Sequence, residues 1–229
     1  MTFRLENPQL KRLNALLGYH FKDAELLKKA LAHRSVSHNN NERLEFLGDA
    51  LLNFIIGAQL FYKFPTAQEG ELTRMRARLV REETVALIAR ELQLHDFIQL
   101  GVGELKSGGH NRASILADAL EAIIGAIYLD ASLEVCKQTL LKWYDTQLKM
   151  IHPDTIQKDP KTLLQEYLQA KSLATPEYVV EKISGLAHEQ TFFVSCTIKA
   201  LSQIFKGQGR SRRVAEQAAA QIALEALQK

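Results

Sequence analysis

The spacing of apolar residues changes once along the chain, and this change constrains the fold more than any other feature. From about residue 5 to residue 150, apolar residues recur every three or four positions, which is typical of amphipathic helices. Leu10, Leu13 and Leu17 show this spacing near the N-terminus. We expect the longer helices near 41–62, 70–93, 113–130 and 132–150, with a glycine-marked flexible connection from Gly101 to Gly109 before the third of these.

A second pattern follows the polar stretch 151–160, which contains two prolines and almost no apolar periodicity. A helix is expected near 160–171, apolar residues alternate from Phe192 to Ile198, and an alanine-rich helix is expected at 212–227. The predicted order is α-β-β-β-α. The chain is therefore predicted to hold an all-α N-terminal domain at 1–150, a linker at 151–157 and a small α+β domain at 158–229.

Bulk composition limits the class of protein without naming a function. Hydrophobic residues make up 46% and charged residues 24% of the 229 residues, as in soluble globular proteins. The N-terminus lacks a signal-peptide pattern and apolar runs fall short of about 18 residues, so we expect a cytoplasmic protein without a membrane partner. Cys136 and Cys196 lack the spacing of a disulfide framework or a zinc site and are expected to be buried. The net charge of +3 permits a polyanionic partner but does not require one.

Three acidic residues share one face of the predicted helix at 41–62. Glu42, Glu45 and Asp49 are spaced i, i+3 and i+7, so their side chains project within roughly a 60° arc. Like charges at this spacing destabilise an isolated helix by a few tenths of a kcal/mol per pair, roughly. A divalent cation bound by these carboxylates would offset their mutual repulsion.

Asp118 and Glu121 repeat the i, i+3 spacing within an apolar helix. Arginine or lysine partners are the alternative explanation for each pair, but two acidic pairs on separate apolar helices favour a metal. Oxygen ligands without cysteine or local histidine suit Mg²⁺, or Mn²⁺ as a substitute, better than zinc. A di-iron bundle would require Glu-x-x-His motifs, whereas Gly48 and Ile124 stand three residues after Glu45 and Glu121.

Three sequence blocks carry a resemblance to a known family. NERLEFLGDA at 41–50 resembles the signature of the ribonuclease III family, and EGELTRMRARLV at 69–80 and ILADALEAIIGAIYLD at 115–130 resemble its next two blocks. The resemblance implies an endonuclease domain whose catalytic carboxylates are Glu45, Asp49, Asp118 and Glu121, with Glu42 and Glu69 as supporting acids. Within that set we expect Glu45, Asp118 and Glu121 to bind metal, while Asp49 and Glu121 serve catalysis.

The same resemblance implies metal-dependent hydrolysis of double-stranded RNA that leaves 5′-phosphates and short 3′ overhangs, in the processing of ribosomal and other structured RNAs. It also implies a homodimer with one site per subunit. The segment from Ala50 to Phe61 is apolar almost all round. Such a helix is either a central core helix or one that also meets its copy across a two-fold interface.

The C-terminal pattern resembles a double-stranded RNA-binding domain, a module that recognises A-form shape across minor grooves. The stretches DPKTLLQEYLQAK, GLAHEQTFF and GQGRSRRVAEQAAA carry this resemblance. Ser211 suits the N-cap of the last helix and places Arg212 and Arg213 in its first turn, where arginines stand in place of the lysines frequent in the family. The RNA-contacting residues implied are Thr162, Gln165, Glu166, His188, Arg210, Ser211, Arg212 and Arg213.

Two other functions stay open from the sequence. The first is a non-cleaving dimer that binds double-stranded RNA, against which the intact set of carboxylates argues. The second is a carboxylate-rich helical metalloprotein that acts on a small molecule, with the C-terminal domain as a protein-interaction module.

Overall fold

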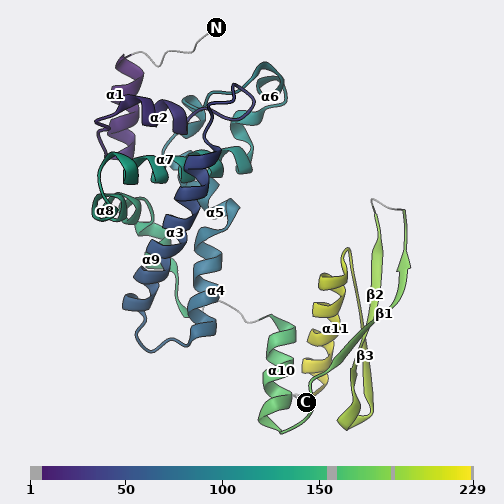
Figure 1. The fold of residues 1–229 in the computed structure, drawn as a ribbon. Helices are drawn as coiled ribbons and strands as arrows, with labels where there is room; N and C mark the ends of the chain where they lie inside the picture. Colours follow the sequence, from purple (N-terminus) through teal and green to yellow (C-terminus); the bar gives the residue numbers. More distant parts are fainter. Residues whose placement is uncertain (1–6, 154–158, 187–188, 228–229) are drawn as a thin grey trace. The chain divides into compact units, whose positions relative to one another are not determined.

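The structure, a computed structural model, describes residues 7–153, 159–186 and 189–227, and it divides into two compact units (Figure 1). The first unit is Met1–Ile156 and the second is Gln157–Lys229. Most of the predicted linker at 151–157 lies outside the described residues, since these stop at Pro153 and resume at Asp159. The predicted fold class, a helical unit followed by an α-β-β-β-α unit, is confirmed.

The described part of the first unit is helical apart from one isolated β-bridge between Ala32 and Gln99. Short 3₁₀ turns at Leu94–Asp96 and Gly109–Asn111 connect some of the α-helices. The α-helices are α1 (Asn7–Leu17), α2 (Ala24–Ala30), α3 (Glu42–Lys63), α4 (Glu69–Val80), α5 (Glu82–Glu91), α6 (Val102–Lys106), α7 (Ala113–Asp130), α8 (Leu133–Trp143) and α9 (Asp145–Met150).

Two predicted helices are divided in the structure. The single helix expected at 70–93 is wrong, because Arg81 has extended backbone angles (φ −67°, ψ 151°) and separates α4 from α5. The break is stabilised locally: Thr84 Oγ1 donates to the Arg78 carbonyl oxygen at 2.8 Å, and two glutamates begin α5, where the helix dipole favours negative charge. The helix expected at 132–150 is likewise interrupted, at Tyr144. The glycine-marked connection contains the short helix α6.

Helix α7 forms the centre of the first unit and crosses α3 at very short range (Figure 1). Two glycines permit this approach. A Cβ atom built on Gly48 would lie 1.7 Å from the Glu121 carbonyl oxygen, and one on Gly125 would lie 2.4 Å from the Leu44 carbonyl oxygen. Any side chain at either position would push the helices apart. The crossing therefore brings the acidic turn of α3 against the acidic turn of α7.

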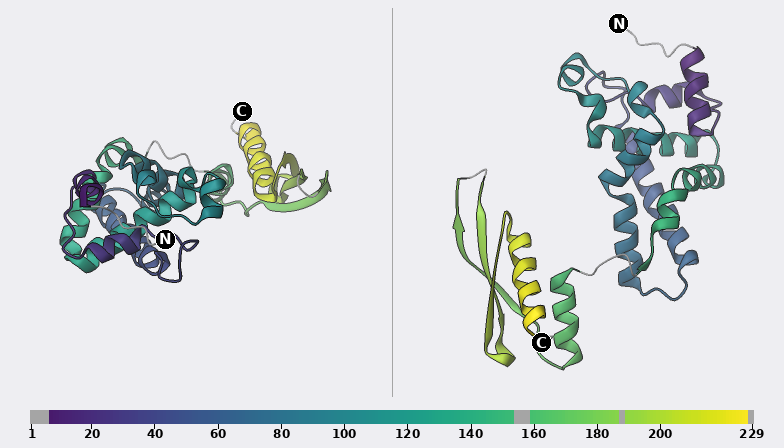
Figure 2. Two further views of the ribbon diagram at one scale, coloured as in Figure 1. Left: turned by 90° about the horizontal axis from the view of Figure 1, so that it is seen from above. Right: turned by 180° about the vertical axis from the view of Figure 1, so that it is seen from behind.

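The second unit is a three-stranded antiparallel sheet with two helices on one face (Figure 2). The strands β1 (Glu177–Ser184), β2 (Thr191–Ile198) and β3 (Gln203–Gly209) are ordered β1-β2-β3, between α10 (Pro160–Ala170) and α11 (Arg212–Leu227). A Cβ atom on Gly207 of β3 would lie 2.2 Å from the Ala219 backbone nitrogen, so α11 packs directly on the strand. Both cysteines are free and buried, Cys136 in the first unit and Cys196 beneath these helices.

Candidate metal centre and nucleic-acid interface

The crossing of α3 and α7 gathers three carboxylates in one place. Ligand oxygens of Glu45, Asp118 and Glu121 all lie within 4.8 Å of one another, and each of these residues is half-buried. Asp49, one turn further along α3, is exposed, and its charge acts on Glu121. One acid of α3 and two acids of α7 thus form one cluster, which we call the carboxylate cluster (Glu45, Asp118 and Glu121).

The surroundings of the carboxylate cluster disfavour the ionised form of its three acids. Burial, followed by the charges of Asp49, Asp118 and Glu45, raises the pKa of Glu121 to about 8. Burial and neighbouring acids also raise the pKa of Glu45 and of Asp118. None of the three forms an ion pair within the part of the chain that the structure describes. Arg34 is the basic residue that acts on the cluster, since its charge lowers the pKa of Glu45 and of Asp118 without an ion pair at contact distance.

A cavity of about 330 Å³ opens beside the cluster, with Glu45 and Asp118 in its lining. Arg34 and Arg112 line it as well, and both guanidinium groups approach acids of the lining: Arg34 lies 3.9 Å from Glu42 and Arg112 lies 3.1 Å from Glu104. The cavity thus has acidic and basic walls. Such a combination fits a bound cation next to an anionic group.

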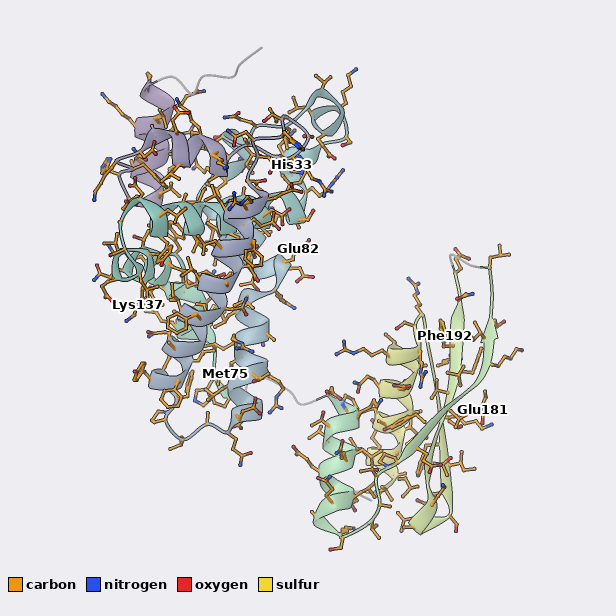
Figure 3. All side chains as sticks on the ribbon, viewed as in Figure 1. His33, Met75, Glu82, Lys137, Glu181 and Phe192 are labelled. Carbon is orange, nitrogen blue, oxygen red and sulfur yellow. The ribbon has the colours of Figure 1, made fainter. Side chains whose placement is uncertain are left out.

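His33, labelled in Figure 3, also lines the cavity and is buried. Its Nδ1 lies 2.8 Å from Ser35 Oγ, and burial is the main cause that lowers its pKa below the ordinary value. The sequence analysis missed His33, Arg34 and Arg112. Their only sequence signal is proximity to the acidic segments: His33 and Arg34 precede α3, and Arg112 immediately precedes α7.

The two supporting acids occupy different places. Glu42 lines the cavity and accepts a hydrogen bond from Asn40 Nδ2 at 3.2 Å. Glu69 is exposed at the start of α4, where it accepts a hydrogen bond from Thr73 Oγ1 at 2.8 Å. Helix α4 follows the end of α3 that lies about 27 Å along the helix from Glu45. A single copy of the chain therefore does not bring Glu69 to the carboxylate cluster.

Three of the predicted RNA-contacting residues lie on α10. Gln165 and Glu166 are exposed. Thr162 is half-buried, and both its backbone nitrogen (3.1 Å) and its hydroxyl (3.0 Å) donate to the carboxylate of Asp159, the N-cap of the helix. His188 lies outside the described residues.

The predicted basic helix start is present at α11. Ser211 Oγ accepts a hydrogen bond from the Val214 backbone nitrogen at 3.3 Å, as an N-cap does. Arg210, Arg212 and Arg213 are all exposed. Arg212 differs from the other two because its Nε donates to Glu216 Oε1 at 2.8 Å. The helix start thus presents several cations at the positive end of the helix dipole, an arrangement suited to phosphates.

Comparisons with known proteins agree with both units. Residues 23–148 match the family model described as Ribonuclease-III-like, and residues 160–227 match the double-stranded RNA binding motif. Ribonuclease 3 of Shewanella amazonensis is 57% identical over 95% of this chain and 96% of its own length, and that of Pasteurella multocida is 56% identical over 96% and 97%. The nuclease domain of ribonuclease III from Campylobacter jejuni has a TM-score of 0.59 at 48% identity, covering 60% of this chain and 96% of that domain.

A helical unit with a carboxylate cluster, followed by a double-stranded RNA binding motif, defines a class of RNA-cleaving enzymes. The chain belongs to the ribonuclease III family. It is a metal-dependent endoribonuclease that acts on double-stranded RNA. A non-cleaving RNA-binding dimer is not favoured, because the relatives over nearly the whole chain are nucleases and the acids are in place.

Proposed function

We propose that the enzyme binds Mg²⁺, with Mn²⁺ as a substitute, at the carboxylate cluster and hydrolyses phosphodiester bonds to leave 5′-phosphates and short 3′ overhangs. The observation that carries the proposal is the set of three carboxylates within 4.8 Å of one another without an ion pair among the described residues. The donor set fits the metal, because hard oxygen ligands are those that Mg²⁺ and Mn²⁺ prefer. The pKa of each of the three acids is raised, first by burial and then by neighbouring acids, which fits a site completed by a cation.

The chain's own groups divide the work. Glu45, Asp118 and Glu121 would hold the metal, and Glu121 would do so in its ionised form. Divalent ions at such a site activate the attacking water and stabilise the leaving oxygen. Asp49, which accepts a hydrogen bond from Asn53 Nδ2 at 2.9 Å and is exposed beside the cluster, orients the water and accepts its proton.

The test is cleavage of a long, end-labelled RNA duplex with Mg²⁺, with Mn²⁺ and with excess chelator. We expect products with both metals and none with chelator, and end analysis should show 5′-phosphates and 3′ overhangs. Cleavage in excess chelator would contradict the metal assignment. Products with 3′-phosphates would contradict the proposed hydrolysis even if the metal dependence held.

We further propose that the enzyme is a homodimer that pairs through α3. Phe46, Phe54 and Phe61 are 80%, 60% and 64% exposed and lie on one face of this helix, which we call the aromatic face. An aromatic stripe of this size on a soluble protein usually marks an interface. The Campylobacter jejuni relative has a region involved in dimer formation of its nuclease domain. Helix α3 is also long and apolar enough to cross a membrane by length and composition alone, but its other face packs on α7.

The dimer proposal is tested by replacing Phe54 with glutamate, which places a charge in the aromatic face. The parent should sediment at twice the 25.8 kDa chain mass, and Phe54→Glu should shift toward the monomer at micromolar concentration. Val102→Glu is the matched control, since Val102 on α6 is 70% exposed but lies outside this face. A parent that is monomeric and active would contradict the proposal.

For the second unit, we propose that α10 contacts a minor groove through Thr162, Gln165 and Glu166. We also propose that His188, between β1 and β2 in the sequence, contacts RNA, and that the α11 start from Arg210 to Arg213 contacts phosphates. Support comes from the match to the RNA binding motif and from the exposure of the arginines.

The substrates proposed are ribosomal and other structured RNAs in the cytoplasm. Depleting the enzyme from cells should cause unprocessed ribosomal precursors to accumulate, and unchanged precursors would contradict this assignment.

A further inference from the structure

Glu216 is a carboxylate with little exposed surface on α11, one turn after the basic helix start. The residue is only 8% exposed. Its Oε1 accepts a hydrogen bond from Arg212 Nε at 2.8 Å, and its Oε2 accepts one from Lys161 Nζ at 2.6 Å. Because Lys161 belongs to α10, the carboxylate joins the starts of both helices.

A second polar link reinforces the same corner of the unit. Gln217 Nε2 donates to Asp159 Oδ1 at 2.9 Å, and Gln217 Oε1 accepts from the Lys161 backbone nitrogen at 3.1 Å. The Lys161 ammonium also lies 4.3 Å from the centre of the Tyr178 ring, which fixes the lysine side chain from another direction. The start of α10 is thus held against the start of α11 by side chains of both helices.

The charge of Glu216 has the wrong sign for RNA binding by itself. A carboxylate repels phosphates. If Glu216 favours RNA binding beside this helix start, it must therefore act through another residue. Arg212 uses only its Nε in the ion pair, and the side chain is 65% exposed, so its terminal nitrogens stay available to solvent. The carboxylate therefore restrains the arginine without occupying the end of its guanidinium group.

We propose that Glu216 is a positioning residue for duplex RNA: it fixes the Arg212 guanidinium and docks α10 on α11, so that both helix starts meet the duplex at one spacing. This inference rests on the proposed RNA contacts of α10 and Arg212. Glu216 itself need not touch RNA. Its role is to reduce the conformational freedom that Arg212 loses on binding.

The test is Glu216→Gln in the full chain, with duplex RNA binding measured over a range of salt concentrations in EDTA, which prevents cleavage. We expect binding weakened roughly tenfold and a log–log salt slope shallower by about one, as when one phosphate contact is lost. If only the charge of the side chain mattered, Glu216→Gln would bind RNA more tightly than the parent, because it removes a negative charge. Glu225→Gln is the matched control: this exposed acid on the same helix is bound by Gln221, and its variant should bind at least as tightly as the parent.

Arg212→Ala and the double variant separate this inference from the proposed RNA contact. If Arg212→Ala binds as tightly as the parent, the proposed contact is wrong. If Arg212→Ala weakens binding but Glu216→Gln does not, the contact stands and the positioning role is wrong. When Glu216 acts through Arg212, adding Arg212→Ala to Glu216→Gln should cause little further loss, and fully additive losses would overturn the inference.

If circular dichroism shows that Glu216→Gln does not fold, Arg212→Lys provides a second test of the positioning role. Lysine keeps the charge but cannot be held through an Nε while it presents further donors outward. We expect its RNA affinity to lie between those of the parent and Arg212→Ala, because lysine keeps the phosphate-binding charge but loses the restraint from Glu216. Full affinity in Arg212→Lys would show that charge suffices and would overturn the positioning role.

Discussion

The two units of this chain treat buried acids in opposite ways. In the first unit, Glu45, Asp118 and Glu121 lie together without an ion pair among the described residues, and the pKa of each is raised. In the second unit, little of the Glu216 surface is exposed, yet hydrogen bonds and charge from Lys161 and Arg212 outweigh burial and lower its pKa. The units differ in whether the chain itself supplies the compensating cation.

This difference separates two uses of a buried carboxylate. Removing an acid from water costs free energy unless a partner compensates it. Where the chain supplies the partner, as at Glu216, the acid contributes to the geometry of its surroundings. Where it does not, as in the carboxylate cluster, we propose that a cation from solution completes the site.

The sharpest way to break the comparison is Glu121→Gln, which keeps the size of the side chain but removes its charge. We expect cleavage of duplex RNA to fall by about three orders of magnitude or more, because a metal ligand is lost. Duplex affinity in EDTA should stay within about twofold of the parent, because binding belongs to the second unit. Glu134→Gln, at an exposed acid on α8, is the control and should cleave normally. Normal cleavage by Glu121→Gln would place the active site elsewhere.

A pair of glycine variants tests whether cleavage depends on the first unit and RNA binding on the second. Gly48→Ala would place a Cβ 1.7 Å from the Glu121 carbonyl oxygen, so α3 and α7 must separate and cleavage should fall by about a hundredfold or more with RNA affinity kept. Gly207→Ala would place a Cβ 2.2 Å from the Ala219 backbone nitrogen and should abolish tight RNA binding instead. Gly103→Ala has open space and should change neither property. The comparison fails if both glycine variants lose the same function.

A smaller effect is expected from the combined Arg212→Ala and Arg213→Ala variant. Two proposed phosphate contacts are removed, so affinity for all duplex sequences should fall by roughly ten- to a hundredfold, and the salt slope should become shallower by about one to two units. At saturating RNA the cleavage rate should largely recover, because the carboxylate cluster is intact. Unchanged affinity would remove the α11 start from the interface.

The smallest expected effects are opposite shifts of thermal stability with pH, measured by calorimetry in EDTA. The folded pKa of Glu121 exceeds its ordinary value, so the metal-free protein loses stability as pH rises from about 4.5 to about 8. Glu121→Gln should therefore melt about 3–6 °C above the parent at pH 8, with a smaller difference near pH 5. The pKa of Glu216 is lowered, so its contribution is present at neutral pH and is lost in acid. Glu216→Gln should melt below the parent at pH 7, with a smaller difference below pH 4.

Local sequence patterns predicted most of the fold and the members of the carboxylate cluster. The i, i+3 and i+7 spacing placed Glu45 and Asp49 on one helix face, and the change in periodicity predicted the α-β-β-β-α order. The break at Arg81 was missed because apolar spacing continues across it, and only Thr84 and the glutamates after it mark the turn.

Contacts between distant segments could not be read from the same patterns. Nothing in the local sequence shows that Arg112 meets the cavity of Glu45, because this depends on the glycine-mediated crossing of α3 and α7. In the second unit, Glu216 resembles a solvated helix acid until Lys161 is brought to it from α10. Spacing therefore identifies side chains on one helix face, whereas their partners come from the tertiary structure.

The most direct test of the account is calorimetric titration of the metal-free enzyme with Mg²⁺ at pH 7, in buffers of different ionisation enthalpy. Because the pKa of Glu121 is raised to about 8, this acid carries a proton that the metal must displace. We expect release of about one proton per chain on Mg²⁺ binding, and little release from Glu121→Gln. Binding without proton release, or equal release by parent and variant, would contradict the claim that the carboxylate cluster awaits a cation from solution.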